Sequence, residues 1–286
     1  MSENNLSTYI QQTIVRQNVR HYVTDHLVIP DSIKNIATET FQRKSQICSV
    51  IFPRRFRSIG SRAFRGCQNL KTVQLPVHIQ MIGPGAFSEC NALREIVIPP
   101  SLTELPRELF AADRSLSEVD FPANSKLNVI RPEAFAECTA LSSLLLPDGI
   151  CTIQERAFYR CKKLQTVHFP KNLKRIHKEA FYFCGLTSLE LPDSLEYIGE
   201  SAFFKCNNLI TAVLPPSIQH IGKWCFHGCN RLKYLEIRHN PDYIGEQIVN
   251  RSVIIRCYKD STVDQYCREN GLQTEYLEKK NMDFLW

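Results

Sequence analysis

Apolar residues recur along the chain with a period of about 23 residues, in the pattern L-x-x-V-x-L-P-x-x-x-x-x-I-G-x-x-A-F-x-x-C. One clear copy begins at Leu70 and ends at Cys90. The last two apolar positions of L-x-x-V-x-L lie two residues apart, so their side chains share one face of a short strand. The proline that follows has no N–H and ends the strand pairing. The pattern predicts stacked coils, each with one short strand.

Three columns of the repeat keep their residue type almost throughout. The proline column is Pro30, Pro53, Pro76, Pro99, Pro122, Pro147, Pro170, Pro192 and Pro215. The phenylalanine column is Phe41, Phe64, Phe87, Phe110, Phe135, Phe158, Phe181, Phe203 and Phe226. Most repeats place alanine before this phenylalanine and cysteine three residues after it, and we expect these side chains to turn inward. We expect Gly60, Gly83, Gly199 and Gly222 to adopt positive φ in a turn.

Two repeats depart from the regular length. The repeat after Pro122 is two residues longer, and the repeat that contains Cys184 is one residue shorter. Both changes are predicted to lie in turns, where they leave the strand register undisturbed.

The two ends of the chain lack the repeat, and we expect them to form caps. A solenoid needs caps because an open end exposes the core and the edge of a strand. We divide the chain into an N-terminal cap at 1–23, with strand or helix expected at 8–10 and 13–15, and an array at 24–238. A C-terminal cap follows at 239–278, with a strand at 252–258 and a helix at 261–271 that ends at a glycine. Residues 279–286 read as a plain tail, or as a segment whose Phe-Leu-Trp end docks on the cap or on a partner.

The in-register columns, with proline in place of the usual asparagine, resemble the BspA-type branch of the leucine-rich repeat family over about residues 24–238. The resemblance implies a curved right-handed solenoid of about nine to ten repeats, an α/β-type horseshoe. A parallel β-sheet is expected on the concave face, with short strands, turns and helical turns on the return path. Relatives in this branch include surface proteins of bacteria and parasitic protists that bind host or bacterial ligands.

Composition adds constraints on compartment and on thiol chemistry. No stretch approaches the roughly 18–20 apolar residues of a membrane helix, and the N-terminus lacks the pattern of a secretory signal. We therefore expect a cytoplasmic location, with a cell-surface or unconventionally secreted location as the alternative. The chain has 12 cysteines, and those of the repeat column are interpreted as buried free thiols, with disulfides or a metal array as alternatives.

The sequence contains none of the motifs G-x-G-x-x-G, G-x-x-x-x-G-K-[ST], H-E-x-x-H or G-x-S-x-G. The 8 histidines are scattered and show no metal-ligand spacing. We predict that the protein is not an enzyme and needs no cofactor or metal.

The exposed side of the predicted strands is the surface best placed to bind another molecule. Its candidate binding residues are Thr72, Gln74, Glu95, Val97, Glu118, Asp120, Ser143, Leu145, Thr166, His168, Ser188, Glu190, Tyr234 and Glu236. Apolar side chains on such a face favour a protein partner, although the β-propensity of Thr, Val and Ile also explains them. The acidic cluster of Glu95, Glu118 and Asp120 either accepts a basic segment or keeps the sheet soluble. The main hypothesis is a protein-interaction module; an adhesin-like surface protein is the alternative.

The net charge of +6 is concentrated in part in one block between Arg43 and Lys71 that contains no acidic residue. Its candidate basic patch is Arg43, Arg54, Arg55, Arg57, Arg62 and Arg65. Such a block is either a solvated outer surface or a site for an anionic partner, including nucleic acid. The oligomeric state is left open by the sequence.

Overall fold

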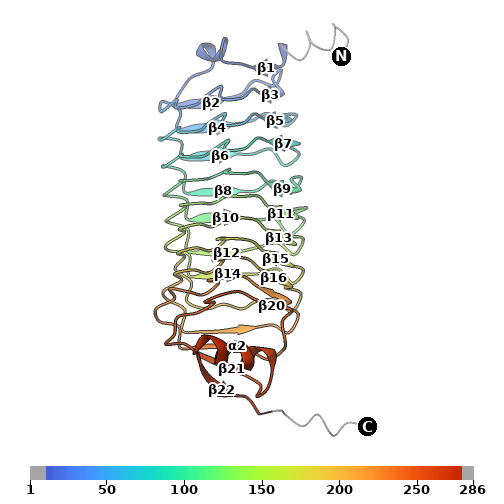
Figure 1. Cartoon of the computed structure of the whole chain (residues 1–286). Helices are drawn as coiled ribbons and strands as arrows, with labels where there is room; N and C mark the ends of the chain where they lie inside the picture. Colours follow the sequence, from blue (N-terminus) through green and yellow to red (C-terminus); the bar gives the residue numbers. More distant parts are fainter. Residues whose placement is uncertain (1–10, 279–286) are drawn as a thin grey trace, which may run out of the picture.

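The chain winds into an elongated stack of coils that carries two columns of parallel β-strands (Figure 1). The structure is a computed structural model, and it describes residues 11–278. The cap segment expected at 8–10 and the tail at 279–286 lie outside the described residues.

The first column, here called the long-strand column, contains strands predicted from L-x-x-V-x-L and continues with two strands of the C-terminal segment, β21 and β22. Its members are β2 (His26–Val28), β4 (Ser49–Ile51), β6 (Thr72–Gln74), β8 (Glu95–Val97), β10 (Glu118–Asp120), β12 (Ser143–Leu145), β14 (Thr166–His168), β17 (Thr211–Leu214), β19 (Tyr234–Ile237), β21 (Ile254–Cys257) and β22 (Gln273–Tyr276). Paired strands run parallel with equivalent residues in register, as in Val50 opposite Val73. The central residue of most of these strands is buried and its two neighbours face outward, as the period of two predicts.

The second column, here called the short-strand column, forms at the Ile/Leu position that follows each proline. Its two-residue strands are β1 (Thr13–Ile14), β3 (Asn35–Ile36), β5 (Ser58–Ile59), β7 (Met81–Ile82), β9 (Glu104–Leu105), β11 (Val129–Ile130), β13 (Thr152–Ile153), β15 (Arg175–Ile176), β16 (Tyr197–Ile198), β18 (His220–Ile221) and β20 (Tyr243–Ile244). The column divides into a four-stranded and a seven-stranded parallel sheet. Most coils therefore contribute one strand to each column, and the paired strands fix the position of a coil relative to its neighbours.

The phenylalanine column forms the centre of the core. All nine rings from Phe41 to Phe226 are fully buried, and consecutive centroids lie between 5.0 and 6.1 Å apart in stacked pairs. The residue before the ring is alanine in most coils, and its carbonyl accepts a hydrogen bond from the phenylalanine of the preceding coil, as that of Ala63 does from the Phe41 N–H at 2.7 Å. Such ring pairs add to the stabilisation from buried apolar area.

The column cysteines are buried thiols with a backbone partner. Each thiol donates to the carbonyl of the phenylalanine in the preceding coil, as Cys67 does to Phe41 at 3.1 Å and Cys161 to Phe135 at 3.1 Å. All 12 cysteines are free thiols. The cysteine column is thus a hydrogen-bonded part of the core.

The prediction of positive φ for Gly60, Gly83, Gly199 and Gly222 is wrong. None of the four adopts a left-handed conformation; a Cβ atom on Gly60 would instead lie 2.5 Å from the carbonyl carbon of Ala37 in the preceding coil. Close approach between coils, not backbone conformation, selects glycine there. Positive φ falls two residues before and two residues after the phenylalanine, as at Glu108 and Ala112 around Phe110.

The prediction that altered repeat lengths leave the strands undisturbed is wrong for the long-strand column. Residues 188–190 form no strand, because the residue missing after Cys184 falls directly before them. The ladder is also interrupted between β10 and β12, which flank the longer repeat, and between β6 and β8, where the repeat length is regular. The short-strand column continues through both altered repeats, with Val129 opposite Glu104 and Thr152, and Arg175 opposite Tyr197.

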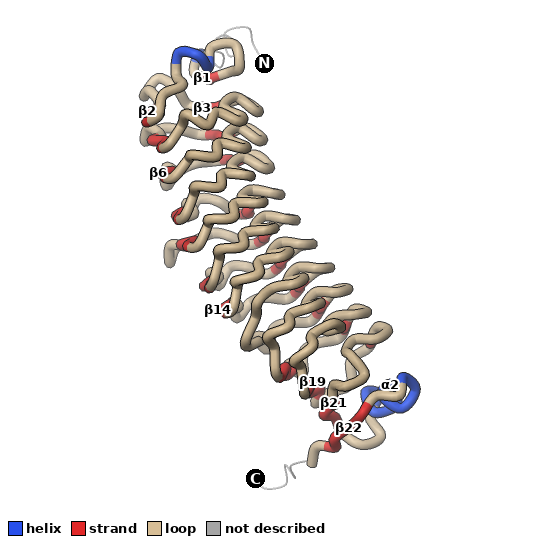
Figure 2. Tube along the Cα trace, turned by 90° about the vertical axis from the view of Figure 1, so that its left-hand side faces the viewer, coloured by secondary structure: helices blue, strands red, loops and turns tan. Residues whose placement is uncertain are grey.

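Helices occur only near the two ends of the described chain (Figure 2). A 3₁₀ turn, η1 (Val19–His21), follows β1 at the N-terminal end. The helix α2 (Thr262–Asn270) packs beside β21 and β22, with Ser261 accepting from the Asp264 N–H and Gly271 in the left-handed region at its end. Ser261 and Gly271 are standard helix-capping residues, so the sequence itself marks both ends of α2.

Candidate interaction surface

The outward face of the long-strand column carries a row of exposed apolar side chains. Its members all lie two residues before a proline or the equivalent position: Val28, Ile51, Val97, Leu145 and Val213, with exposed fractions of 61%, 44%, 56%, 70% and 50%. Most of the strands that carry these side chains are paired with the strand of an adjacent coil. The pairing fixes the backbone from which each side chain extends. An ordered apolar row of this kind suits contact with another macromolecule.

An acidic cluster, Glu95, Glu118 and Asp120, lies on β8 and β10 in the middle of this row. Glu95 is directly opposite Glu118, and Asp120 is opposite Val97. All three side chains are exposed, and none forms an ion pair with any residue that the structure describes. Like charges directly opposite each other destabilise a sheet, so this arrangement has a cost in the isolated protein.

Two hollows meet at Asp120. The first has a volume of about 420 Å³ and is lined by residues 72–75, 95–97 and Asp120. The second has a volume of about 490 Å³ and is lined by residues 117–120, 142–145 and His168. Together they form a surface that combines carboxylates with the exposed side chains of Val97 and Leu145.

The hollows bring together nine of the predicted binding residues: Thr72, Gln74, Glu95, Val97, Glu118, Asp120, Ser143, Leu145 and His168. Thr166 is half-buried on the neighbouring strand β14. Ser188 and Glu190 are exposed but lie where the strand is missing. Tyr234 and Glu236 belong to a separate sheet beyond that interruption.

The expectation that Glu236 faces solvent is wrong. Its exposed fraction is 8%, because Arg238 pairs with it and Arg256 lies opposite it on β21. The Arg256 guanidinium also covers the Tyr234 ring, 4.0 Å from its centroid. Arg256 lies outside the regular repeat, so the column pattern does not reveal it.

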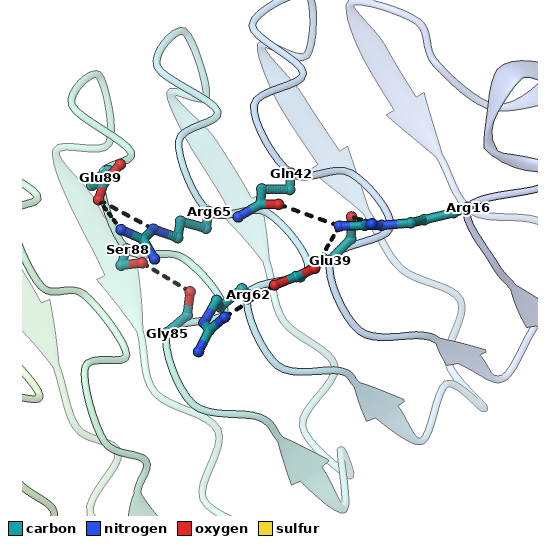
Figure 3. Close-up of polar contacts among 8 residues, drawn as sticks. All are labelled: Arg16, Glu39, Gln42, Arg62, Arg65, Gly85, Ser88 and Glu89. Atoms are coloured by element: carbon teal, nitrogen blue, oxygen red, sulfur yellow. Dashed lines mark hydrogen bonds and ion pairs between the residues drawn. The ribbon is translucent and has the colours of Figure 1, made fainter.

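The six predicted patch arginines fall into two groups. Arg43, Arg62 and Arg65 flank the phenylalanine column on the return path, where Arg62 pairs with Glu39 at 3.0 Å and Arg65 with Glu89 at 2.6 Å (Figure 3). Glu39 also pairs with Arg16 of the preceding coil (Figure 3). Glu39 and Glu89 lie one repeat away in sequence from the arginines that they pair with. For this reason the segment from Arg43 to Lys71 contains no acidic residue although two of its arginines are paired.

The other group, Arg54, Arg55 and Arg57, lies in the turn between β4 and β5. There it lines a separate groove with Lys34 and His78, which are not among the six predicted patch residues. The repeat spacing itself contains the signal, since Lys34 and Arg57 occupy the same column in consecutive repeats, as do Arg55 and His78.

The column thiols Cys67 and Cys229 are unsuited to nucleophilic chemistry. Burial raises the pKa of Cys67 and of Cys229 to about 12, although hydrogen bonds with backbone groups oppose the shift. In residues 11–278, no three or more His, Cys, Asp or Glu side chains are grouped so as to hold a metal ion.

A family model decides the classification of the chain. The model of the BspA-type leucine-rich repeat region, with 6 copies, matches residues 20–140 and 128–255. The chain belongs to the BspA-type leucine-rich repeat family. Repeat proteins of this kind are typically non-catalytic scaffolds that present a long surface. No curated protein matches this BspA-type chain.

Solved structures of bacterial leucine-rich repeat proteins share the fold. A leucine-rich repeat protein from Bacteroides ovatus is 26% identical with a TM-score of 0.71, and the match covers 83% of this chain but only 63% of that protein. A leucine-rich cell-surface protein from Faecalibacterium prausnitzii is 22% identical with a TM-score of 0.54, over 94% of this chain and 84% of that one. The pneumococcal vaccine antigen PcpA is 18% identical with a TM-score of 0.53, over 90% and 79% of the two chains. Across the described residues, no helix has both the length and the apolar character needed to cross a membrane.

Proposed function

We propose that this BspA-type repeat protein is a non-catalytic interaction module whose long-strand face binds a basic, partly apolar segment of another polypeptide. The observation that supports the proposal best is the unpaired acidic cluster between exposed apolar side chains. Glu95, Glu118 and Asp120 have no counter-ion among residues 11–278, whereas the return-path acids Glu39 and Glu89 are paired with arginines. Lysine or arginine side chains of a partner would supply the missing counter-charges.

The two hollows on this face define how such a segment would lie. The hollows adjoin at Asp120 and together extend from β6 to β14. Five neighbouring strand positions span about 19 Å at the usual strand spacing. This length accommodates an extended segment of about six residues. Val97 and Leu145, one on each side of Asp120, would contact apolar side chains of the segment.

Comparative co-purification tests the proposed surface. Wild-type protein is compared with the triple charge reversal Glu95→Lys, Glu118→Lys and Asp120→Lys. The control carries the same charge change at Asp193→Lys, Asp242→Lys and Glu246→Lys, which are exposed and unpaired among the described residues. We expect the triple reversal, but not the control, to lose the partners of the wild-type protein. The same partner profile for all three proteins would reject this surface.

A further inference from the structure

The turn between β4 and β5 forms a groove separate from the long-strand face. It has a volume of about 640 Å³ and is lined by Lys34, residues 54–57, His78 and Gln80. Four of its residues, Lys34, Arg54, Arg55 and Arg57, carry permanent positive charge at neutral pH. The imidazole of His78 lies beside them.

Backbone hydrogen bonds hold these side chains at the spacing of the coils. The Arg57 N–H donates to the Lys34 carbonyl at 2.7 Å, and the Gln80 N–H donates to the Arg57 carbonyl at 2.8 Å. Lys34, Arg57 and Gln80 therefore occupy consecutive levels of the stack. Between Arg55 and Arg57, the Phe56 side chain is buried and packs on Phe52 at 4.7 Å between ring centroids. This anchor fixes the turn, so the groove exists before any ligand arrives.

The positive charges of the groove have no acidic partner within the described residues. Lys34, Arg54, Arg55 and Arg57 form no ion pair with any residue in the described part of the chain. Asp31, one level before Arg54, is exposed and is likewise outside the described ion pairs. In the same column farther along the stack, Lys174 does have an acidic neighbour, Glu196, at 3.3 Å. The groove instead stacks Lys34 on Arg57, an arrangement in which like charges repel.

The chemistry of the side chains indicates what would relieve this repulsion. Guanidinium groups bind phosphate oxygens with two parallel hydrogen bonds, and several such groups favour a ligand with high charge density. Three levels of the stack span about 10 Å at the usual strand spacing, which is longer than one phosphate group. We propose that the groove of Lys34, Arg54, Arg55, Arg57 and His78 binds a compact polyanion that carries two or more phosphate groups.

This site is independent of the proposed polypeptide surface. None of its lining residues lies in the two hollows that meet at Asp120. The two proposals can therefore be tested separately. Substitutions in the groove do not change the acidic cluster, and substitutions in the acidic cluster do not change the groove.

Calorimetric titration with inorganic tripolyphosphate at low ionic strength tests the site. The test variant is Arg55→Gln with Arg57→Gln. The control, Lys163→Gln with Arg231→Gln, removes the same charge at exposed positions that make no ion pair in the described structure. We expect the wild-type protein and the control to bind with similar affinity and the test variant to bind at least about tenfold more weakly. Binding should also weaken as salt is added.

A second arm separates a soluble ligand from a lipid headgroup. Flotation is measured with phosphatidylcholine vesicles with and without a bisphosphorylated inositol lipid. Flotation that requires this lipid and Arg55 with Arg57 assigns the site to a headgroup, and tripolyphosphate binding without flotation assigns it to a soluble ligand. Absence of binding in both arms, or equal losses in the test and control variants, would overturn the proposal. Circular dichroism of both variants checks that the fold is retained.

Discussion

Asp113 is the residue at which this chain departs most from its own core pattern. It takes the place of the column cysteine, is fully buried, and accepts a hydrogen bond from the Cys90 N–H at 2.6 Å. Its second carboxyl oxygen has no hydrogen-bond partner in the described structure. Burial raises the pKa of Asp113 well above its usual range, although the Cys90 N–H opposes the shift. The folded protein therefore holds this carboxyl in its neutral form over a wider pH range than the unfolded chain does.

Replacing Asp113 with cysteine should stabilise the protein and alter how its stability depends on pH. Because the folded-state pKa is raised, the carboxyl favours folding fully below about pH 4, the unfolded value, and progressively less as pH rises through the folded-state pKa. The advantage of Asp113→Cys in free energy of unfolding should therefore grow from pH 4 to pH 7, where we expect about 1–3 kcal/mol. Urea unfolding at several pH values measures it. Asp113→Asn, which cannot titrate, serves as the control, and a constant difference between wild type and Asp113→Asn would contradict this account.

The positive φ values beside the phenylalanine column support a second prediction at the scale of single residues. Ala112 and Gly66 share the column two residues after the phenylalanine, with φ of 63° and 72°. A left-handed conformation costs an L-residue about 1–2 kcal/mol relative to glycine. Glycine loses more conformational freedom on folding, and this loss offsets part of its advantage. Ala112→Gly should therefore raise the free energy of unfolding by about 0.5–1 kcal/mol, and Gly66→Ala should lower it. Denaturant unfolding of both variants provides the measurement, and shifts of the same sign would be inconsistent with the assignment.

At the scale of the strands, the period of the sequence predicts most of the observed fold. Alternation in L-x-x-V-x-L locates most strands of the long-strand column, and the family and fold class inferred from the in-register columns are confirmed. The short-strand column is not predicted, because one strand is expected in each coil. The sequence does not reveal the role of Gly60, because close contact between coils depends on residues one repeat away. It also does not reveal the pairing of Arg62 and Arg65 with acids on adjacent coils. The two hollows at Asp120 depend on side-chain packing across strands, which column positions alone do not specify.

The missing strand at 188–190 predicts uneven protection of the amides within one coil. The backbone N–H groups of Ser188, Leu189 and Glu190 form no ladder, whereas Tyr197 and Ile198 of the same coil lie inside the seven-stranded sheet. Exchange of amide hydrogens reports such local opening. We expect rapid exchange at 188–190 and slow exchange at 197–198, measured by mass spectrometry or NMR. Equal protection of the two segments would show that the long-strand column continues through the shorter repeat.

At the scale of the whole molecule, the solenoid separates its charged surfaces. The acidic cluster lies on the outward face of β8 and β10, and the basic groove lies in the turns that lead to the short-strand column. The column thiols and the rings of the phenylalanine column are buried in the core. One rigid stack thus displays two surfaces of opposite charge, which suit ligands of different chemistry.

Selection from a displayed peptide library tests the central claim, that the long-strand face binds basic segments, most directly. Peptides selected on the wild-type protein should combine lysine or arginine with aliphatic residues. Their affinity should fall about tenfold or more for Glu95→Gln with Glu118→Gln and Asp120→Asn, because an ion pair at an exposed site contributes up to about 1 kcal/mol and three such pairs are lost together. Selected peptides without basic residues, or peptides that bind this variant as tightly as the wild type, would contradict the account.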